Sequence, residues 1–113
     1  MSRNELNSVE TSIEQATAAI ELGKCLDRLY ENKDFQLLIA KEFFVSESVN
    51  LVGLLGKTTD PVQKEQILNN MMAISGLKSY FAKVTNSATQ AIIDLEDNEQ
   101  ARQSILIEGL DIK

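Results

Sequence analysis

The chain of 113 residues contains no histidine and a single cysteine. Without histidine it lacks the most common general base and the most common protein metal ligand. The serine and cysteine hydrolase arrangements that depend on a histidine are excluded as well, and so is a structural zinc site. The sequence therefore predicts a protein that is not an enzyme and that carries no metal or other cofactor.

Cys25, the only cysteine, cannot form an internal disulfide. It falls in a helical pattern beside Leu22, Leu26 and Leu29, where it is expected to act as a small apolar side chain. Lys24 precedes it, but consecutive helical residues do not face each other. We therefore do not expect a reactive thiol.

Two further patterns lack the spacing that chemistry requires. Residues 53–57 read GLLGK, but neither the spacing of a phosphate-binding loop nor a preceding strand is present. Residues 94–99 include Asp94, Glu96, Asp97 and Glu99, and this consecutive spacing distributes the carboxylates around a helix. Such a cluster is typical of a solvated helix end, and we expect no small-molecule ligand.

The charge balance is acidic, with a net charge of −6 and scattered lysines and arginines. Nucleic-acid backbones and anionic membranes attract clustered basic residues, so direct binding to either is not expected. No apolar run approaches the roughly 18 residues of a membrane-spanning helix. The polar first ten residues lack a signal-peptide core, which predicts synthesis in the cytoplasm.

Proline occurs once, at Pro61, and apolar residues recur at spacings of three and four. This periodicity predicts an all-α fold, a helical hairpin or small bundle with two short central helices and one long C-terminal helix. The first helix is expected to end near Tyr30, with Gly23 marking either a close helix approach or a bend. Residues 1–104 would form a single domain, and residues 105–113 an apolar tail.

The middle segment opens with Asp34 as the expected N-cap, and Phe35, Ile39 and Phe43 share one helical face. Ser46 is expected to cap a second short helix that ends at Gly56. Phe44 would then point away from the main face, toward a partner. Both helices are apolar on more than one side, which places them either centrally in the core or under another chain.

The long helix is expected to begin at Pro61, with Asp60 as its N-cap, and to extend at least to Asn98. A heptad pattern follows, and a buried asparagine within it can set the register of paired helices. Two arrangements fit: packing against the first helix of the same chain, or self-association between chains. The seam residues are Ile67, Asn70, Ile74, Leu77, Phe81, Val84, Ala88, Ala91 and Leu95.

The end of the chain changes character, with three consecutive apolar residues and an expected break at Gly109. It fits either a frayed tail or an apolar docking peptide. The candidate partner-binding residues are Phe44, Ile105, Leu106, Ile107, Leu110 and Ile112.

Residues 22–55 combine a leucine-rich helix, a polar turn, an Asp-Phe pair, an aromatic pair and a Leu/Val-rich helix. This stretch resembles small all-helical proteins encoded among the virion and assembly genes of tailed bacteriophages. Glu42 stands where that pattern carries a glycine. The residues that carry the resemblance are Leu26, Leu29, Asp34, Phe35, Phe43, Phe44, Glu47, Leu51 and Val52.

The resemblance implies a non-enzymatic structural or assembly component of a phage particle. Such a protein would form homo-oligomers, contact larger virion proteins and reside in the virion after synthesis in the host cytoplasm. The alternative is an acidic phage-encoded regulator that binds and inhibits a host protein, which the charge of −6 permits.

Overall fold

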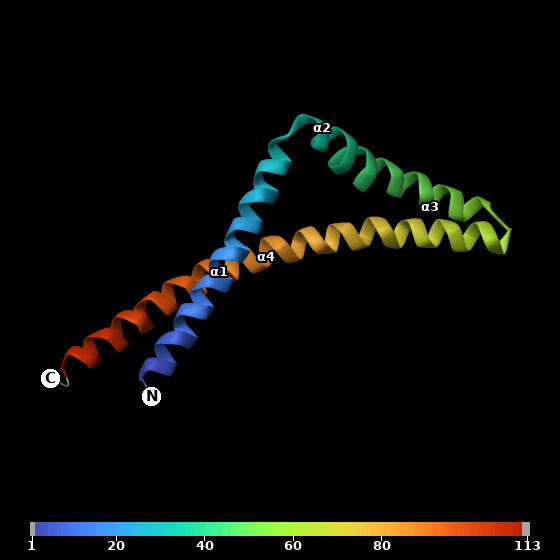
Figure 1. Ribbon diagram of the computed structural model, residues 1–113. Coiled ribbons are helices and arrows are strands. Elements are labelled where there is room, and N and C mark those ends of the chain that lie inside the picture. Colours follow the sequence, from blue (N-terminus) through green and yellow to red (C-terminus); the bar gives the residue numbers. More distant parts are fainter. Residues whose placement is uncertain (1, 112–113) are drawn as a thin grey trace. The chain divides into compact units, whose positions relative to one another are not determined.

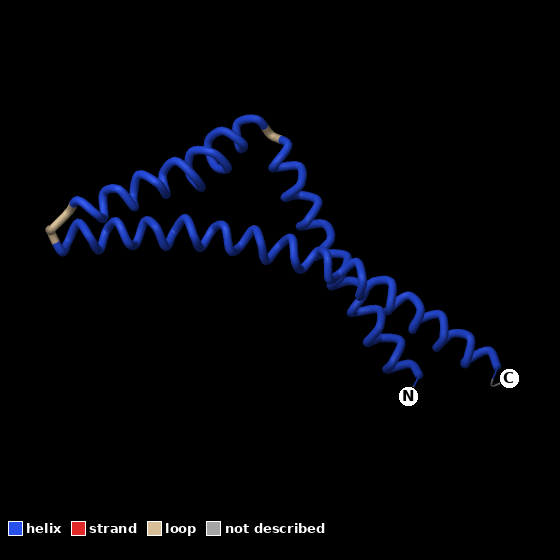
Figure 2. The backbone as a smooth tube through the Cα atoms, turned by 180° about the vertical axis from the view of Figure 1, so that it is seen from behind, coloured by secondary structure: helices blue, strands red, loops and turns tan. Residues whose placement is uncertain are grey.

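The computed structural model describes residues 2–111, and within this range the chain is helical except at two short connections (Figures 1 and 2). The all-α fold and the long C-terminal helix are confirmed. In chain order the elements are α1 (Ser2–Glu31), α2 (Lys33–Phe35), the π-helix η1 (Gln36–Ser46), α3 (Glu47–Lys57) and α4 (Pro61–Asp111).

The chain divides into two compact units, and α1 and α4 contribute to both of them. The terminal unit combines the residues up to Cys25 with those from Val84 onward. The hairpin unit spans Leu26–Lys83 and contains α2, η1, α3 and the first part of α4.

The two connections are held by local hydrogen bonds. At the first connection the side chain of Asn32 accepts a hydrogen bond from the Phe35 backbone N–H at 3.0 Å, and Gln36 Nε2 donates to the carbonyl of Tyr30 at 2.6 Å. The N-cap is therefore Asn32 and not Asp34, because the helix begins two residues earlier than the sequence pattern indicated.

The second connection follows the prediction. Asp60 Oδ1 accepts from the backbone N–H of Val62 at 3.0 Å, and α4 begins at Pro61. Proline suits this position because the first amide of a helix has no intrahelical acceptor.

The middle helices form one continuous run, since Ser46 has helical dihedral angles and its side chain makes no capping hydrogen bond. The expected joint at Ser46 is therefore absent. The expected stop at Gly56 is also wrong, because α3 continues to Lys57 and Gly56 does not adopt a positive φ. In place of the joint, η1 provides eleven residues of wider helix, and the Glu47 N–H bonds to the Glu42 carbonyl.

In the terminal unit α1 and α4 run antiparallel and approach each other through small side chains. Ala16 and Ala91 are buried. A Cβ built on Gly23 would lie only 2.5 Å from the Cβ of Ala88. Of the two explanations for a glycine at this position, the structure supports a close helix approach.

The end of α4 is more regular than expected. The helix passes through Gly109 without a break and ends at Asp111, so most of the expected tail is helical. Ile112, the last of the candidate partner-binding residues, lies outside the described residues.

Candidate functional site

The predicted seam of α4 faces inward in the hairpin unit. Ile74 is 3% exposed and joins the core formed with Phe44 and Leu51, and half-buried Ile67, Leu77 and Phe81 pack against that core. Asn70 is the exception, because its side chain is exposed. Most of the seam in this unit is therefore filled by helices of the same chain.

In the terminal unit the seam is also directed inward. Val84 and Ala91 are buried, and Ala88 and Leu95 are half-buried. Pairing this seam with a second chain would displace contacts such as the one between Gly23 and Ala88. The seam in this unit therefore lies against the same chain, and its part in self-association stays a prediction.

Phe44 does not lie on the surface as the sequence pattern suggested, because only 6% of it is exposed. Its ring centroid lies 5.9 Å from that of Phe81 and 5.9 Å from that of Phe43. A turn of π-helix takes more residues than a turn of α-helix. Phe35 and Phe44 therefore lie on the same inward face. The α-helical period had instead placed Phe43 on that face.

Further aromatic contacts tie the end of α1 to this core. The rings of Tyr30 and Phe35 are 5.0 Å apart in an edge-to-face arrangement, and both rings lie about 6 Å from Phe81. Arrangements of this kind stabilise aromatic pairs beyond the effect of their burial. Lys78 Nζ lies over the ring of Phe44, 5.5 Å from its centroid.

An open groove runs along one side of the hairpin unit, between the middle helices and α4. It consists of two adjoining cavities of about 340 and 730 Å³ that share Glu47, Leu51 and Asn70. Glu42 borders the first cavity and Lys57 the second. Those two charged side chains therefore lie on the same flank of the middle helices.

The side of the middle helices that faces away from α4 is apolar, and we call it the outer face. Val45 is 56% exposed, Val49 67% and Val52 57%, and Leu37 continues the row toward the start of η1. Gly53 and Gly56 lie on the same side, and a Cβ at either position would meet no atom within 4 Å. The outer face therefore consists of a row of exposed valines beside two glycines, Gly53 and Gly56.

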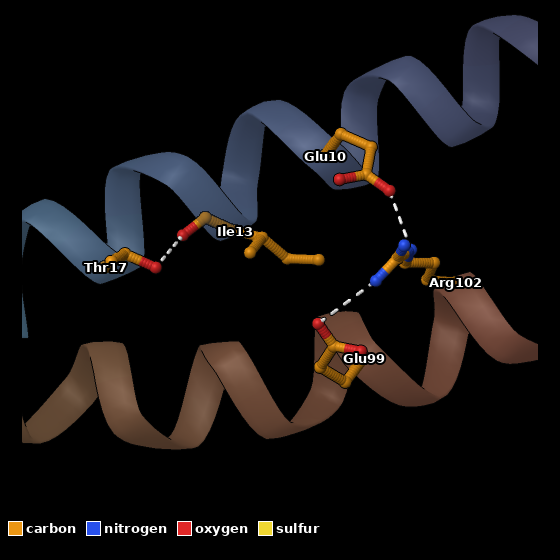
Figure 3. Close-up of polar contacts among 5 residues, drawn as sticks. All are labelled: Glu10, Ile13, Thr17, Glu99 and Arg102. Atoms are coloured by element: carbon orange, nitrogen blue, oxygen red, sulfur yellow. Dashed lines mark hydrogen bonds and ion pairs between the residues drawn. The ribbon is translucent and has the colours of Figure 1, made fainter.

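The terminal unit carries a polar contact between its helices (Figure 3). Arg102 of α4 lies 2.7 Å from a carboxylate oxygen of Glu10 on α1 and 3.6 Å from Glu99 on its own helix. These side chains are close to half exposed, so each ion pair contributes at most about 1 kcal/mol. The contact joins Glu10 of α1 to the Arg102 region of α4.

A recess of about 390 Å³ lies farther along the same pair of helices. Its lining includes Ser12, Gln15, Gln90, Asp94 and Asn98. Gln90 donates to Asp94 at 3.0 Å and Asn98 donates to the Asp94 carbonyl at 2.8 Å. The polar groups of Gln90, Asp94 and Asn98 in this lining are thus already hydrogen-bonded within α4.

The remaining candidate partner-binding residues lie near the end of α4. Leu106 and Ile107 are 47% and 57% exposed, and Ile105 is half-buried on the inward side. The backbone of Leu110 is helical, and its side chain is outside the described part of the structure. Phe44, the remaining candidate of this set, belongs to the hairpin unit and is enclosed in its core.

Within residues 2–111 no cluster of three or more histidine, cysteine or acidic side chains has the arrangement of a metal site. No helix in that range is both long and apolar enough to cross a membrane. Comparison with protein-family models, with curated proteins and with solved structures finds no match to the chain.

Sequence reasoning missed the outer face as a separate surface. The signal was present, because Val45, Val49, Val52 and Gly56 recur at the spacing of one helix side. The segment was recognised as apolar on several sides. Which side the core would cover depended on the π-helix, and the residue types do not reveal it.

Proposed function

We propose that this chain is a non-enzymatic structural or assembly component of a tailed bacteriophage particle. It acts through contacts between helices, both with copies of itself and with larger virion proteins. The proposal is supported by the resemblance of residues 22–55 to small helical proteins of phage assembly genes.

The exposed apolar surface of the hairpin unit carries the proposal. Four described side chains of this unit are buried hydrophobic residues, namely Leu26, Phe44, Leu51 and Ile74. Twelve large hydrophobic side chains of the same unit are substantially exposed. Where exposed apolar side chains gather, as Val45, Val49 and Val52 do on the outer face, the surface marks a place where another molecule binds.

Mass spectrometry of purified virions tests the proposal. We expect the chain at a fixed copy number that survives extensive washing of the particles. Its absence from particles and from assembly intermediates would contradict the structural role.

The same experiment decides about the alternative function, a regulator that inhibits a host protein. A regulator would be found in infected cells bound to a host protein and would be missing from virions. The observation behind this alternative is the net charge of −6. Lysines and arginines are mixed among the acidic residues, which favours the assembly role.

A further inference from the structure

We propose that the outer face of the middle helices binds the same face of a second copy of this chain, with the two copies antiparallel about a two-fold axis. The inference rests on the self-association included in the proposed function and identifies the surface responsible. It is carried by the exposed valines, the open glycine positions and the placement of the flanking charges.

The apolar character of the outer face requires a cover. A helix packed on one side only normally presents charged and polar residues to water. Here the same helices that bury Phe44 and Leu51 also present Val45, Val49 and Val52 to water, each more than half exposed. Burying them in a contact removes apolar surface from water, at roughly 25 cal/mol for each Å².

The glycines allow a second helix to come close. Gly53 and Gly56 border the valines, and the space that a Cβ would occupy at either position is open. Small residues on a contacting helix let the two backbones approach, so that larger side chains of the partner fill the gaps. The ridge of valines and the glycine gaps on one copy are thus complementary to those on another.

The flanking charges point to a second copy as the occupant. Glu42 and Lys57 lie on the same flank of the helices, toward the groove. Neither forms an ion pair with another described residue. The midpoint between them in the sequence falls between Val49 and Asn50, in the middle of the outer face.

A two-fold axis at that midpoint, perpendicular to the plane of the paired helices, reverses the helix direction and keeps each flank on its own side. Glu42 of each copy then lies beside Lys57 of the other, which gives two symmetric ion pairs. Val45 lies opposite the stretch from Val52 to Gly56 of the second copy. A parallel two-fold pairing would place the two copies of Glu42 on opposite flanks, and neither would lie beside Lys57 of the other copy.

Lys41 gains a favourable position in the same arrangement. It is exposed and lies one helical turn before Val45 on the outer face. In the antiparallel pair it faces the carboxyl end of the second copy's α3, where the last carbonyl groups carry partial negative charge. This interaction gives the charge of Lys41 a favourable partner although its neighbours on the outer face are apolar.

The first part of the test compares two substitutions of similarly exposed residues by sedimentation equilibrium. Val49→Asp places a charge at the centre of the proposed contact, whereas Met72→Asp, at a residue 70% exposed on α4, is the matched control. We expect Val49→Asp to be monomeric and Met72→Asp to remain dimeric, with equal helical signal by circular dichroism. A Val49→Asp chain that stays dimeric would overturn the inference.

The second part tests the antiparallel pairing. Glu42→Lys and Lys57→Glu should each weaken dimerisation by about tenfold, because each creates two like-charge contacts. The double variant Glu42→Lys/Lys57→Glu should recover close to the original affinity. A double variant that is weaker than both single variants would contradict the two-fold arrangement.

These outcomes are separate from the test of the phage assignment. A dimer that responds to the substitutions as stated supports the inference even if virions lack the chain. A chain that is abundant in virions and monomeric in solution at micromolar concentration overturns the inference and leaves the proposed function standing.

Discussion

At the scale of single residues, the clearest difference between sequence pattern and structure concerns Phe43 and Phe44. The pattern placed Phe43 on the inward face and Phe44 away from it. Both are phenylalanines in an apolar segment, yet Phe44 is buried at 6% exposure and Phe43 only partly covered. The difference arises from the wider turn of η1, which carries the inward face to Phe44.

Truncating Phe44 should therefore cost more stability than truncating Phe43. We expect Phe44→Ala to lower the free energy of unfolding by about 3–5 kcal/mol, because a buried aromatic ring is lost and a cavity remains. Phe43→Ala should cost less than half as much. Urea unfolding followed by circular dichroism measures both values, and equal losses would show that the inward face is assigned incorrectly.

The glycines provide a second pair of residues with opposite expected effects. At Gly23 a new Cβ would lie 2.5 Å from that of Ala88, whereas at Gly76 it would meet no atom within 4 Å. Gly76→Ala should stabilise the chain by about 1 kcal/mol through helix propensity. Gly23→Ala should destabilise it by a net amount of about 1–2 kcal/mol, because forced overpacking outweighs that gain.

Thermal unfolding of both variants checks this prediction. Adding Ala88→Gly to Gly23→Ala removes the opposing methyl group and should restore part of the lost stability. Stabilisation by Gly23→Ala alone would mean that α1 and α4 lie farther apart than the structure places them.

At the scale of elements, the sequence predicted the helices well and their joints poorly. Asp60 and Pro61 together identify the start of α4, because an acceptor side chain followed by proline suits few other positions. The connection near Asn32 offers several adjacent residues that can cap, and only the observed hydrogen bond to Phe35 distinguishes them. The π-helix has no comparable sequence signal, so the continuity through Ser46 could not be foreseen.

The capping assignment can be tested directly. Asn32→Ala should lower stability by about 1 kcal/mol, because the Phe35 N–H loses its side-chain acceptor. Asp34→Ala, at the residue that the sequence pattern indicated, should change stability by less than half of that amount. Chemical unfolding of the two variants side by side gives the comparison, and a larger loss for Asp34→Ala would return the N-cap to that residue.

Of the candidate site, the sequence predicted the inward residues of α4 but not the outer face. The heptad pattern of α4 marked residues such as Ile74 and Val84, which the structure buries. An apolar stripe predicts burial whether the helix packs against its own chain or against another chain. The pattern alone does not distinguish packing within one chain from packing between two chains. The outer face became recognisable only once the positions of Phe44 and Leu51 showed which side of the middle helices was already covered.

At the scale of the whole molecule, the chain is two helical units that each bury few side chains. The terminal unit depends on a close approach of small residues, and the hairpin unit on one aromatic cluster. Small cores of this kind gain stability from association, because a bound partner stabilises the folded state. Unfolding should therefore shift to a higher midpoint as protein concentration increases, and Val49→Asp should abolish that shift.

The mass of the unmodified chain in solution, measured by sedimentation equilibrium at micromolar concentration, tests the central claim most directly. The account predicts a species of twice the 12.6 kDa of one chain, in equilibrium with monomer on dilution. A single species of 12.6 kDa across the whole micromolar range would contradict it.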